Sequence, residues 1–343
     1  MIRTIICAVT TVFIANASSA STFTSFFAFG DSLSDDGKGL TAFNPPPFNG
    51  GRFSTGPVWT EVLADEFISR GLNTANFALG GATAGNTNTQ DANFLFFDSL
   101  NPDPNAIDLF DLGTFQRQID FFTPTAGTPA LGDNPLVSVL FGANDIFQGG
   151  SPVQAALDVI TGITALNDLD SSLDSFLVAN LPDLALTPDG ASDPASSLAT
   201  AAFNTTLETG LASLELTRGL DIIRLDQARF LQDIIDTPSA LGLTNVTDAC
   251  VQAPDPATNF AGSNCTITGF AADGSPIFDV SIAETFLFLD DVHPNGTVQN
   301  AFGEFAISAL GSSAPGVVPL PASLPLMLGG FGILALARRR KAS

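Results

Sequence analysis

The middle of the chain alternates short hydrophobic runs with longer segments of helical spacing. The short runs are rich in Phe, Val, Ile and Leu, and several stop at a glycine or an asparagine, which is typical of buried β-strands. The predicted strands cover residues 23–29, 74–78, 136–141, 176–180 and 221–225. Helices are predicted for residues 57–69, 152–166 and 196–217, and the first two begin at a proline, which the first turn of a helix tolerates.

This alternation predicts one domain, from about residue 21 to residue 311, built on a parallel sheet that helices cover on both faces. Residues 94–111 and 248–279 show neither pattern, and we predict loop-like insertions there. No internal repeat is visible along the chain.

Polar clusters follow the predicted strands at their carboxyl ends, where function collects in sheets of this kind. The clusters are residues 30–32 (GDS), 80–83 (GGAT) and 142–145 (GAND), together with 290–294 (DDVHP) late in the chain. We therefore expect these clusters to converge on one rim of the sheet.

Ser32 is the candidate nucleophile of this rim. A serine hydroxyl reacts poorly at neutral pH unless a base lies within hydrogen-bond reach and a further group orients that base. His293 is the only histidine of the chain, so a serine hydrolase that uses histidine must use this one. Asp290 lies three residues earlier and is favoured as the orienting acid; Asp291 is the alternative.

The oxygen of an attacked carbonyl needs fixed hydrogen-bond donors. The candidates are the backbone N–H of Gly81, the side-chain amide of Asn144 and the backbone N–H of Ser32. Within the Gly80-Gly81 pair, the spacing from Asn76 favours Gly81.

These motifs together resemble the GDSL, or SGNH, hydrolase family. The matching segments are FGDSLSDDG around Ser32, NFALGGAT around Gly81, FGANDIF around Asn144 and DDVHP around His293. Residues 51–59 (GRFSTGPVW) and 179–183 (ANLPD) are similar to the lipase-like branch, as is Phe203-Asn204 within the long helix. The resemblance covers essentially the whole domain, in family order.

The resemblance implies a three-layer α/β/α sandwich with a mainly parallel, flavodoxin-like central sheet. It also implies hydrolysis of carboxylic esters by a Ser-His-Asp triad of Ser32, His293 and Asp290. The G-x-S-x-G elbow of the α/β-hydrolases is absent around Ser32, which favours this family over that one.

Composition narrows the possible partners. Acidic residues outnumber basic ones 35 to 12, for a net charge of −23, which makes nucleic acid an unlikely partner. The chain has no tyrosine, so no phenol takes part in catalysis. The acids near Ser32 and those within 98–111 lack the spacing of a calcium loop, and we predict no metal and no cofactor.

Both ends of the chain carry targeting patterns. Residues 1–20 have an early basic residue, an apolar run and small residues at the end, which predicts a secretory signal cleaved after Ala20 or after Ala17, rather than a buried strand. Residues 318–343 combine VPLPA, an apolar segment and a basic cluster, and resemble the PEP-CTERM sorting signals of Gram-negative bacteria. That resemblance implies transient insertion in the inner membrane, cleavage by an exosortase-type enzyme, and a mature protein at the cell surface or outside the cell.

Removal of the signal takes Cys7 and leaves Cys250 and Cys265. A pair of cysteines in an exported chain favours a disulfide, and two buried free thiols are the alternative.

The sequence leaves the ester substrate open. Short acyl esters, glycerolipids and O-acetyl groups on polysaccharide all fit, and the sorting signal favours a polysaccharide target by association. Residues 94–97 form either an acyl groove or part of the core. The competing function is a non-catalytic surface protein that uses the same fold for binding or adhesion.

Overall fold

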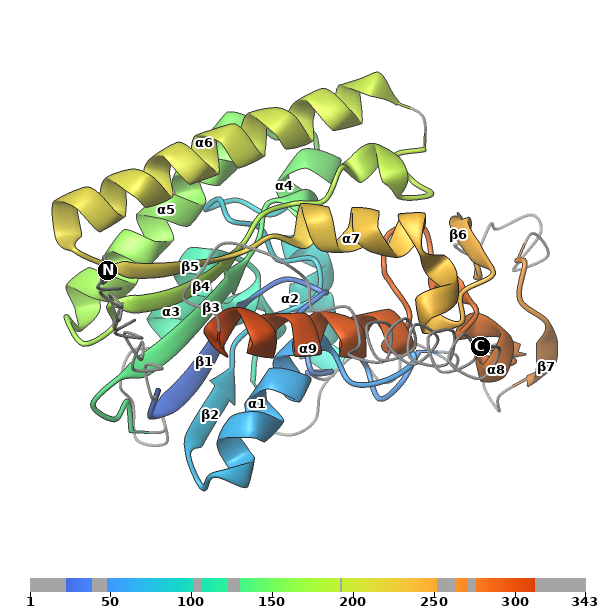
Figure 1. Ribbon diagram of the computed structural model, residues 1–343, viewed down its shortest axis with the longest axis horizontal. Coiled ribbons are helices and arrows are strands. Elements are labelled where there is room, and N and C mark those ends of the chain that lie inside the picture. Colours follow the sequence, from blue (N-terminus) through green and yellow to red (C-terminus); the bar gives the residue numbers. More distant parts are fainter. Residues whose placement is uncertain are drawn as a thin grey trace, which may run out of the picture.

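The computed structural model describes residues 23–38, 48–100, 107–122, 130–191, 193–251, 263–270 and 276–311 (Figure 1). The predicted signal peptide and the predicted sorting signal lie outside these ranges. Within the described ranges, no helix combines the length and the apolar character needed to cross a bilayer.

A five-stranded parallel sheet forms the centre of the molecule, in the order β2-β1-β3-β4-β5. Its strands are β1 (Ser25–Gly30), β2 (Asn73–Asn76), β3 (Pro135–Leu140), β4 (Ser175–Ala179) and β5 (Asp221–Leu225). β1 lies between β2 and β3, so the chain first adds β2 on one side of β1 and then adds β3, β4 and β5 on the other side. Flavodoxin-like sheets have the same order. The predicted parallel sheet is therefore confirmed.

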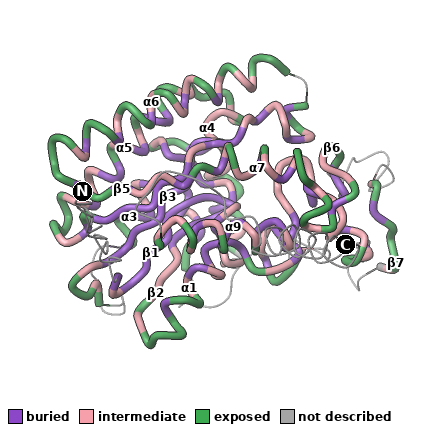
Figure 2. Tube along the Cα trace, in the orientation of Figure 1, coloured by how far each residue is buried: buried purple, intermediate pink, exposed green. Residues whose placement is uncertain are grey.

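Alternate residues of each strand enter two separate hydrophobic layers, because successive side chains of a strand point to opposite faces. Phe27, Val137, Phe176 and Ile222 are register partners across β1, β3, β4 and β5, and all four belong to one layer. Their chain neighbours, such as Phe26, belong to the other layer. Figure 2 shows the sheet as the buried centre of the molecule.

Helices cover both faces, which confirms the predicted three-layer sandwich. The helices α3 (Phe115–Phe122), α5 (Pro152–Leu169) and α6 (Pro194–Arg218) pack on one face, and α1 (Trp59–Ser69) and α9 (Gly296–Gly311) on the other, with α7 (Gln227–Asp236) against α9. The long helices begin at side-chain caps: Ser151 accepts from Gln154 N at 3.3 Å and Asp193 from Ala195 N at 2.9 Å. Short elements complete this part: α4 (Ala143–Phe147), η2 (Leu184–Leu186) and η3 (Pro238–Leu241).

The prediction of a loop-like insertion at 94–111 is wrong for much of its length. Helix α2 (Asp91–Leu100) and the 3-10 helix η1 (Leu109–Leu112) occupy it. Asp98 joins the two elements, because its carboxylate accepts from Leu109 N at 2.7 Å and from Phe110 N at 3.0 Å. Phe94 is buried in the core, whereas Phe96 is exposed. The regular structure therefore covers the two ends of the predicted insertion, and residues 101–106 lie outside the described ranges.

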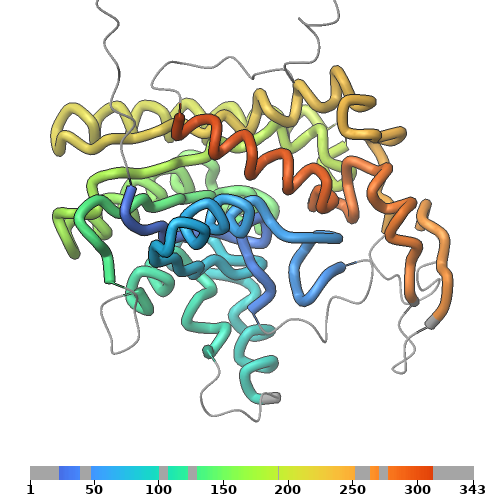
Figure 3. Tube along the Cα trace, turned by 60° about the horizontal axis from the view of Figure 1, so that its bottom comes forward, coloured from blue at the N-terminus to red at the C-terminus, as the bar shows by residue number. Residues whose placement is uncertain are grey.

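The second predicted insertion, 248–279, also contains regular structure. The strand β6 (Asn245–Ala249) pairs with β9 (Phe286–Phe288), and β7 (Ile267–Phe270) forms an antiparallel pair with β8 (Pro276–Phe278). With helix α8 (Val280–Ala283), these strands make a lobe at one end of the sheet, from which α9 leads back across the domain (Figure 3).

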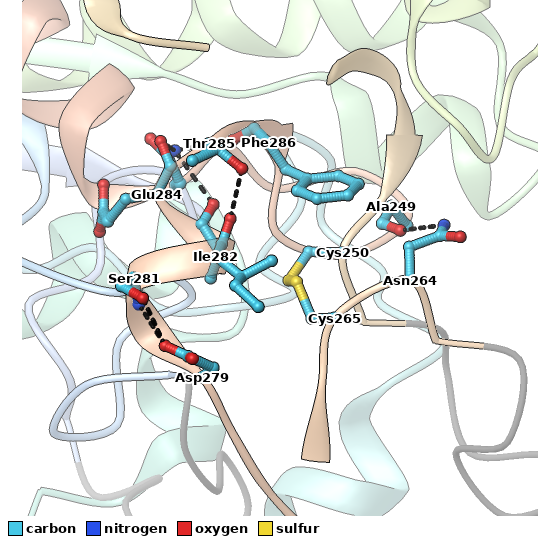
Figure 4. Close-up of a disulfide and its surroundings, with 12 residues drawn as sticks. Ala249, Cys250, Asn264, Cys265, Asp279, Ser281, Ile282, Glu284, Thr285 and Phe286 are labelled. Atoms are coloured by element: carbon cyan, nitrogen blue, oxygen red, sulfur yellow. Dashed lines mark hydrogen bonds between the residues drawn. A yellow bond between two sulfur atoms is a disulfide. The ribbon is translucent and has the colours of Figure 1, made fainter. Parts of the chain in front are cut away.

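A disulfide joins Cys250 and Cys265 inside this lobe (Figure 4). Both cysteines are buried against Val251, Phe278 and Leu289, and Asn264 Nδ2 donates to Ala249 O beside them at 2.7 Å. The disulfide therefore lies in a small hydrophobic core of its own, separate from the two layers of the central sheet.

Candidate active site

Ser32 lies in a tight turn directly after β1. The turn is closed by Asp31, whose carbonyl accepts from Ser34 N at 3.0 Å and whose Oδ1 accepts from Leu33 N at 3.1 Å. The end of β1 is held by the buried side chain of Gln118, which accepts from Gly30 N at 3.0 Å and donates to Gly30 O at 2.9 Å. The Ser32 backbone is thereby held at the carboxyl end of the sheet.

Ser34 holds the same turn in place through hydrogen bonds of its hydroxyl and its carbonyl. Its hydroxyl accepts from Trp59 Nε1 at 3.1 Å, and its carbonyl accepts from Asn76 Nδ2 at 2.7 Å and Thr60 Oγ1 at 2.9 Å. Ser34 is fully buried, so these bonds also satisfy groups that water does not reach.

The His293 imidazole reaches this turn across 261 positions of sequence. Its Nε2 lies 2.7 Å from Ser32 Oγ. Its Nδ1 lies 2.8 Å from Asp290 Oδ2 and 3.0 Å from Asp290 Oδ1. Asp290 Oδ1 also accepts from His293 N at 2.7 Å and Val292 N at 2.9 Å, which fixes the carboxylate on the loop. Of the two acids proposed to orient the histidine, Asp290 is the one that contacts the ring.

The loop that carries His293 is fastened on several sides. The ring of Phe53 packs on the imidazole, with their centroids 4.8 Å apart. Asn295 is fully buried, and its Nδ2 donates to Phe286 O at 2.7 Å and Glu284 O at 3.0 Å. Leu289 N donates to His293 O at 2.7 Å. The imidazole therefore has little freedom to turn away from Ser32.

Two carboxylates near the imidazole have opposite pKa shifts. Burial alone would raise the pKa of Asp290, but the charge of His293 and the hydrogen bonds from its ring and backbone bring that pKa below its ordinary value. At Asp31 burial prevails and raises the pKa to about 7. Burial alone would lower the pKa of His293, yet Asp290, with a smaller effect of Asp31, raises that pKa above 6.5.

The two glycines after β2 have different surroundings. Gly80 N donates to Asp35 Oδ2 at 2.8 Å, and a Cβ on Gly80 would lie 2.1 Å from the Phe53 ring. Gly81 adopts a φ of 82°, which favours glycine, and its carbonyl accepts from Asn88 Nδ2 at 2.8 Å. Because the Gly80 N–H is engaged by Asp35, Gly81 is the better candidate for an oxyanion donor.

Asn144 is the second residue of α4, whose N-cap is the left-handed Gly142. Its Nδ2 donates to Ala82 O at 3.0 Å, which places the side chain beside the turn after β2. The next residue, Asp145, accepts from Ala84 N at 2.9 Å and Gly85 N at 3.1 Å. Asn144 and Asp145 thus each join the turn after β3 to the turn after β2.

Sequence reasoning missed the residues that hold these turns together. Asp35 is fully buried and accepts from three backbone N–H groups, those of Gly80, Gly37 and Lys38. Asp145 has a comparable role between the second and third turns. Both belong to quoted motifs, which was a usable signal. Gln118 lies outside every motif and had none.

A small apolar cavity of about 50 Å³ is lined by Leu33, which follows Ser32, and by Val292 and Pro294, which flank His293. Phe230 and Phe288 line it further in, and the buried Oε1 of Gln227 has no hydrogen-bond partner there. Among the residues that the structure describes, no three His, Cys, Asp or Glu side chains gather as a metal site.

The arrangement agrees with what comparison with known proteins finds. The model of the GDSL-like lipase/acylhydrolase family matches residues 26–306. The chain belongs to this family. It is 31% identical over 334 residues to a phosphatidylcholine-sterol acyltransferase from Aeromonas hydrophila, a match that covers 86% of this chain and 92% of the relative. The GDSL-family protein described here is accordingly a carboxylic ester hydrolase.

Solved structures similar to this GDSL-family chain include two bacterial proteins. One is a putative GDSL-like lipase from Parabacteroides merdae, with 11% identity and a TM-score of 0.43, covering 84% of this chain and 95% of that one. Another is an acetylxylan esterase from Geobacillus stearothermophilus, with 11% identity and a TM-score of 0.42, also covering 84% and 95%.

Proposed function

We propose that this chain is a serine esterase that works through an acyl-enzyme on Ser32. The observation that carries the proposal is the 2.7 Å distance between Ser32 Oγ and His293 Nε2, with Asp290 2.8 Å from the other ring nitrogen. A hydroxyl, a base and an orienting acid within hydrogen-bond reach are the arrangement that nucleophilic catalysis by serine requires.

In the first half of the reaction, Ser32 Oγ attacks the ester carbonyl and its proton passes to His293 Nε2. The C–O bond to the alcohol then breaks, and the imidazolium gives that proton to the departing alkoxide. Asp290 keeps the imidazole in the tautomer with the proton on Nδ1 and stabilises the imidazolium. The acyl group remains on Ser32.

In the second half, water attacks the acyl group and loses a proton to His293 Nε2, which returns it to Ser32 Oγ as the acid departs. In both halves the carbonyl oxygen gains negative charge, and Gly81 N–H, Asn144 Nδ2 and Ser32 N–H are the donors we assign to it. The Asn144 amide already lies beside the turn of Gly81 through its bond to Ala82 O.

Hydrolysis of p-nitrophenyl acetate or butyrate tests the proposal. We expect Ser32→Ala to abolish turnover and labelling by a fluorophosphonate probe. Ser69→Ala is the matched control, because Ser69 is an exposed serine at the end of α1. Turnover by Ser32→Ala equal to wild type would refute the assignment, and a wild-type protein that does not label would favour the alternative of a non-catalytic binding protein.

Acyl transfer to an alcohol is a second candidate, because the relative that is 31% identical is named for it. It uses the same acyl-enzyme, with an acceptor alcohol in place of water in the second half. Product analysis with a phospholipid donor and an added sterol separates the two: transfer yields an esterified sterol, and hydrolysis yields only free acid.

We also propose that the protein is exported, on the pattern of residues 1–20, and sorted to the surface by an exosortase-type enzyme, on the pattern of residues 318–343. The sorting signal would insert transiently in the inner membrane. Mass spectrometry of the exported protein tests both ends: we expect a start at Ser21 or Ser18 and loss of the basic cluster. An intact full-length mass outside the cell would contradict this.

A further inference from the structure

A polar groove of about 320 Å³ opens beside the turns that carry Gly81 and Asn144. One wall is the loop after β2 and the other is α4 with the first turns of α5. Amides, hydroxyls and carboxylates form most of the lining, among them Asn86, Thr87, Gln148, Ser151, Gln154 and Asp158. The groove therefore differs in character from the apolar cavity on the His293 side.

The groove is lined by residues that lie close in sequence to the two oxyanion candidates, Gly81 and Asn144. Thr83, at its inner end, lies two residues after Gly81, and Asp145, in the opposite wall, follows Asn144. Asp145 joins the two walls by accepting from Ala84 N at 2.9 Å and Gly85 N at 3.1 Å. The two walls are therefore continuous in sequence with the turns that carry Gly81 and Asn144.

The base of the groove is held by hydrogen bonds. Asn88 is buried, and its Nδ2 donates to Gly81 O at 2.8 Å and Gly113 O at 2.7 Å. Gln148 Nε2 donates to Asn88 Oδ1 at 3.2 Å, and Gln148 Oε1 accepts from Thr89 N at 2.9 Å. The walls are therefore preorganised, which lowers the entropic cost of binding a ligand between them.

The chemistry of the lining selects the ligand. Side-chain amides and hydroxyls both donate and accept hydrogen bonds, as sugar hydroxyls do. Among the described residues that line the groove none is Lys or Arg, and Asp145 and Asp158 would repel a phosphate. An acyl chain would leave this polar lining without partners. We propose that the groove binds the sugar part of an acylated carbohydrate, which makes such esters the substrate class of the proposed esterase.

This inference rests on the proposed function, and the experiment separates the two. The full protein is assayed on methyl 6-O-acetyl-glucoside and on p-nitrophenyl acetate, which share the acetyl group and differ in the alcohol. The readout is the ratio of the two kcat/KM values. The test variant is the double change Asn86→Ala with Gln154→Ala, because these exposed side chains come from opposite walls.

Gln232→Ala is the matched control. Gln232 is an exposed glutamine on α7, outside the groove, and its Nε2 donates to Asp236 at 2.9 Å, as Gln154 Nε2 does to Asp158 at 3.0 Å. We expect the double variant to lower the ratio about tenfold, since each lost hydrogen bond to the sugar accounts for roughly threefold. The control should keep the wild-type ratio.

An unchanged ratio in the double variant overturns the inference, as does an equal fall in the control. A third substrate, dihexanoyl phosphatidylcholine, identifies a lipid site: a fall in kcat/KM for that ester alone assigns the groove to a headgroup and also overturns the inference. Failure of the proposed function has a different signature, because the wild-type protein would then hydrolyse none of the three esters.

Discussion

At the scale of single residues, Asp31 and Asp290 show how two acids near one imidazole acquire different charge states. Burial raises the pKa of Asp290, but the charge of His293 and the hydrogen bonds that Asp290 accepts from N–H groups lower it by more. Asp31 accepts one N–H from Leu33, and this does not offset its burial. Asp290 therefore stays ionised at neutral pH, whereas Asp31 titrates near pH 7.

Asp31→Asn should move the acid limb of the kcat/KM profile to lower pH. The asparagine keeps an oxygen for Leu33 N but removes the negative charge that helps to raise the pKa of His293. His293 must be neutral to accept the Ser32 proton, so the variant should gain relative activity below the wild-type midpoint, which we expect above pH 6.5. A pH–rate profile with p-nitrophenyl acetate measures the shift.

A stability measurement provides the control for this variant. Because the pKa of Asp31 is about 7 in the folded state and about 4 when unfolded, the folded protein binds more protons between these values. The free energy of unfolding contributed by Asp31 therefore falls as the pH rises from about 4 through 7. Asp31→Asn should lose this part of the pH dependence. An acid limb and a stability profile both identical to wild type would contradict the role of Asp31.

At the scale of elements, acidic side chains join the turns that follow neighbouring strands. Asp35, after β1, accepts from Gly80 N after β2, and Asp145, after β3, accepts from Ala84 N and Gly85 N. Hydrogen bonds thus connect the turns that follow β1, β2 and β3. The sequence indicated which turns carry polar residues, but which backbone group a carboxylate binds depends on the packing of the strands.

Asp35→Asn should lower kcat about tenfold or more with a smaller change in KM. The two carboxylate oxygens of Asp35 accept from Gly80 N and from two further backbone N–H groups. An asparagine amide has one oxygen and one NH₂ group, so it leaves at least one of these donors without an acceptor, and the Gly80-Gly81 turn would shift. A small displacement of an oxyanion donor raises the barrier without weakening substrate binding to the same degree. Steady-state kinetics with p-nitrophenyl butyrate measure both constants.

The neighbouring acid supplies the control for this change. Asp36 forms an ion pair with Lys38 Nζ at 2.6 Å on the partly exposed side of the same loop. Asp36→Asn should leave kcat within about twofold of wild type, because the Asp36 carboxylate binds Lys38 Nζ, whereas Gly80 N binds Asp35. Equal losses in both variants would mean that any change in this loop disturbs the turn, and Asp35 would have no special role.

The elements themselves were predictable to different degrees. The strand at 221–225 is confirmed residue for residue, and the long helix predicted at 196–217 extends from Pro194 to Arg218. These segments have a clear hydrophobic period and ordinary caps. Helix α2 was missed, because the period of DANFLFFDSL is blurred by exposed hydrophobic residues such as Leu95 and Phe96. When hydrophobic side chains of a helix are exposed, the hydrophobic period of the sequence no longer marks its buried face, and the helix is not recognised.

At the scale of the whole molecule, the lobe of residues 245–289 leads into the segment that places Asp290 and His293 beside Ser32. Strand β9 leads directly to Asp290 and His293, and β9 pairs with β6, which ends at Ala249, immediately before Cys250. Cys250 N donates to Phe288 O at 3.0 Å and Val251 N to Leu289 O at 2.8 Å. The disulfide therefore stabilises the segment that positions Asp290 and His293, two of the three residues of the proposed triad.

Replacing both cysteines, Cys250→Ala with Cys265→Ala, should lower the free energy of unfolding by about 3 kcal/mol, the typical effect of a cross-link that closes a loop of this length. Thermal or urea unfolding followed by circular dichroism measures the change. We expect a reducing agent to lower the unfolding midpoint of the wild type and to leave that of the double variant unchanged. A double variant as stable as wild type would show that packing alone holds the lobe.

The sequence by itself determined the alternation of strands and helices, the residue types of the site and their order along the chain, because hydrophobic period and side-chain chemistry are local properties. Its single histidine left no choice of base. Tertiary structure alone decided that His293 lies 2.7 Å from Ser32, with Asp290, the acid already favoured from the sequence, 2.8 Å from the other ring nitrogen. It also decided the pKa of Asp31 and the presence of a polar groove beside Asn144. These properties depend on distance, burial and enclosure, which arise only when segments remote in sequence pack together.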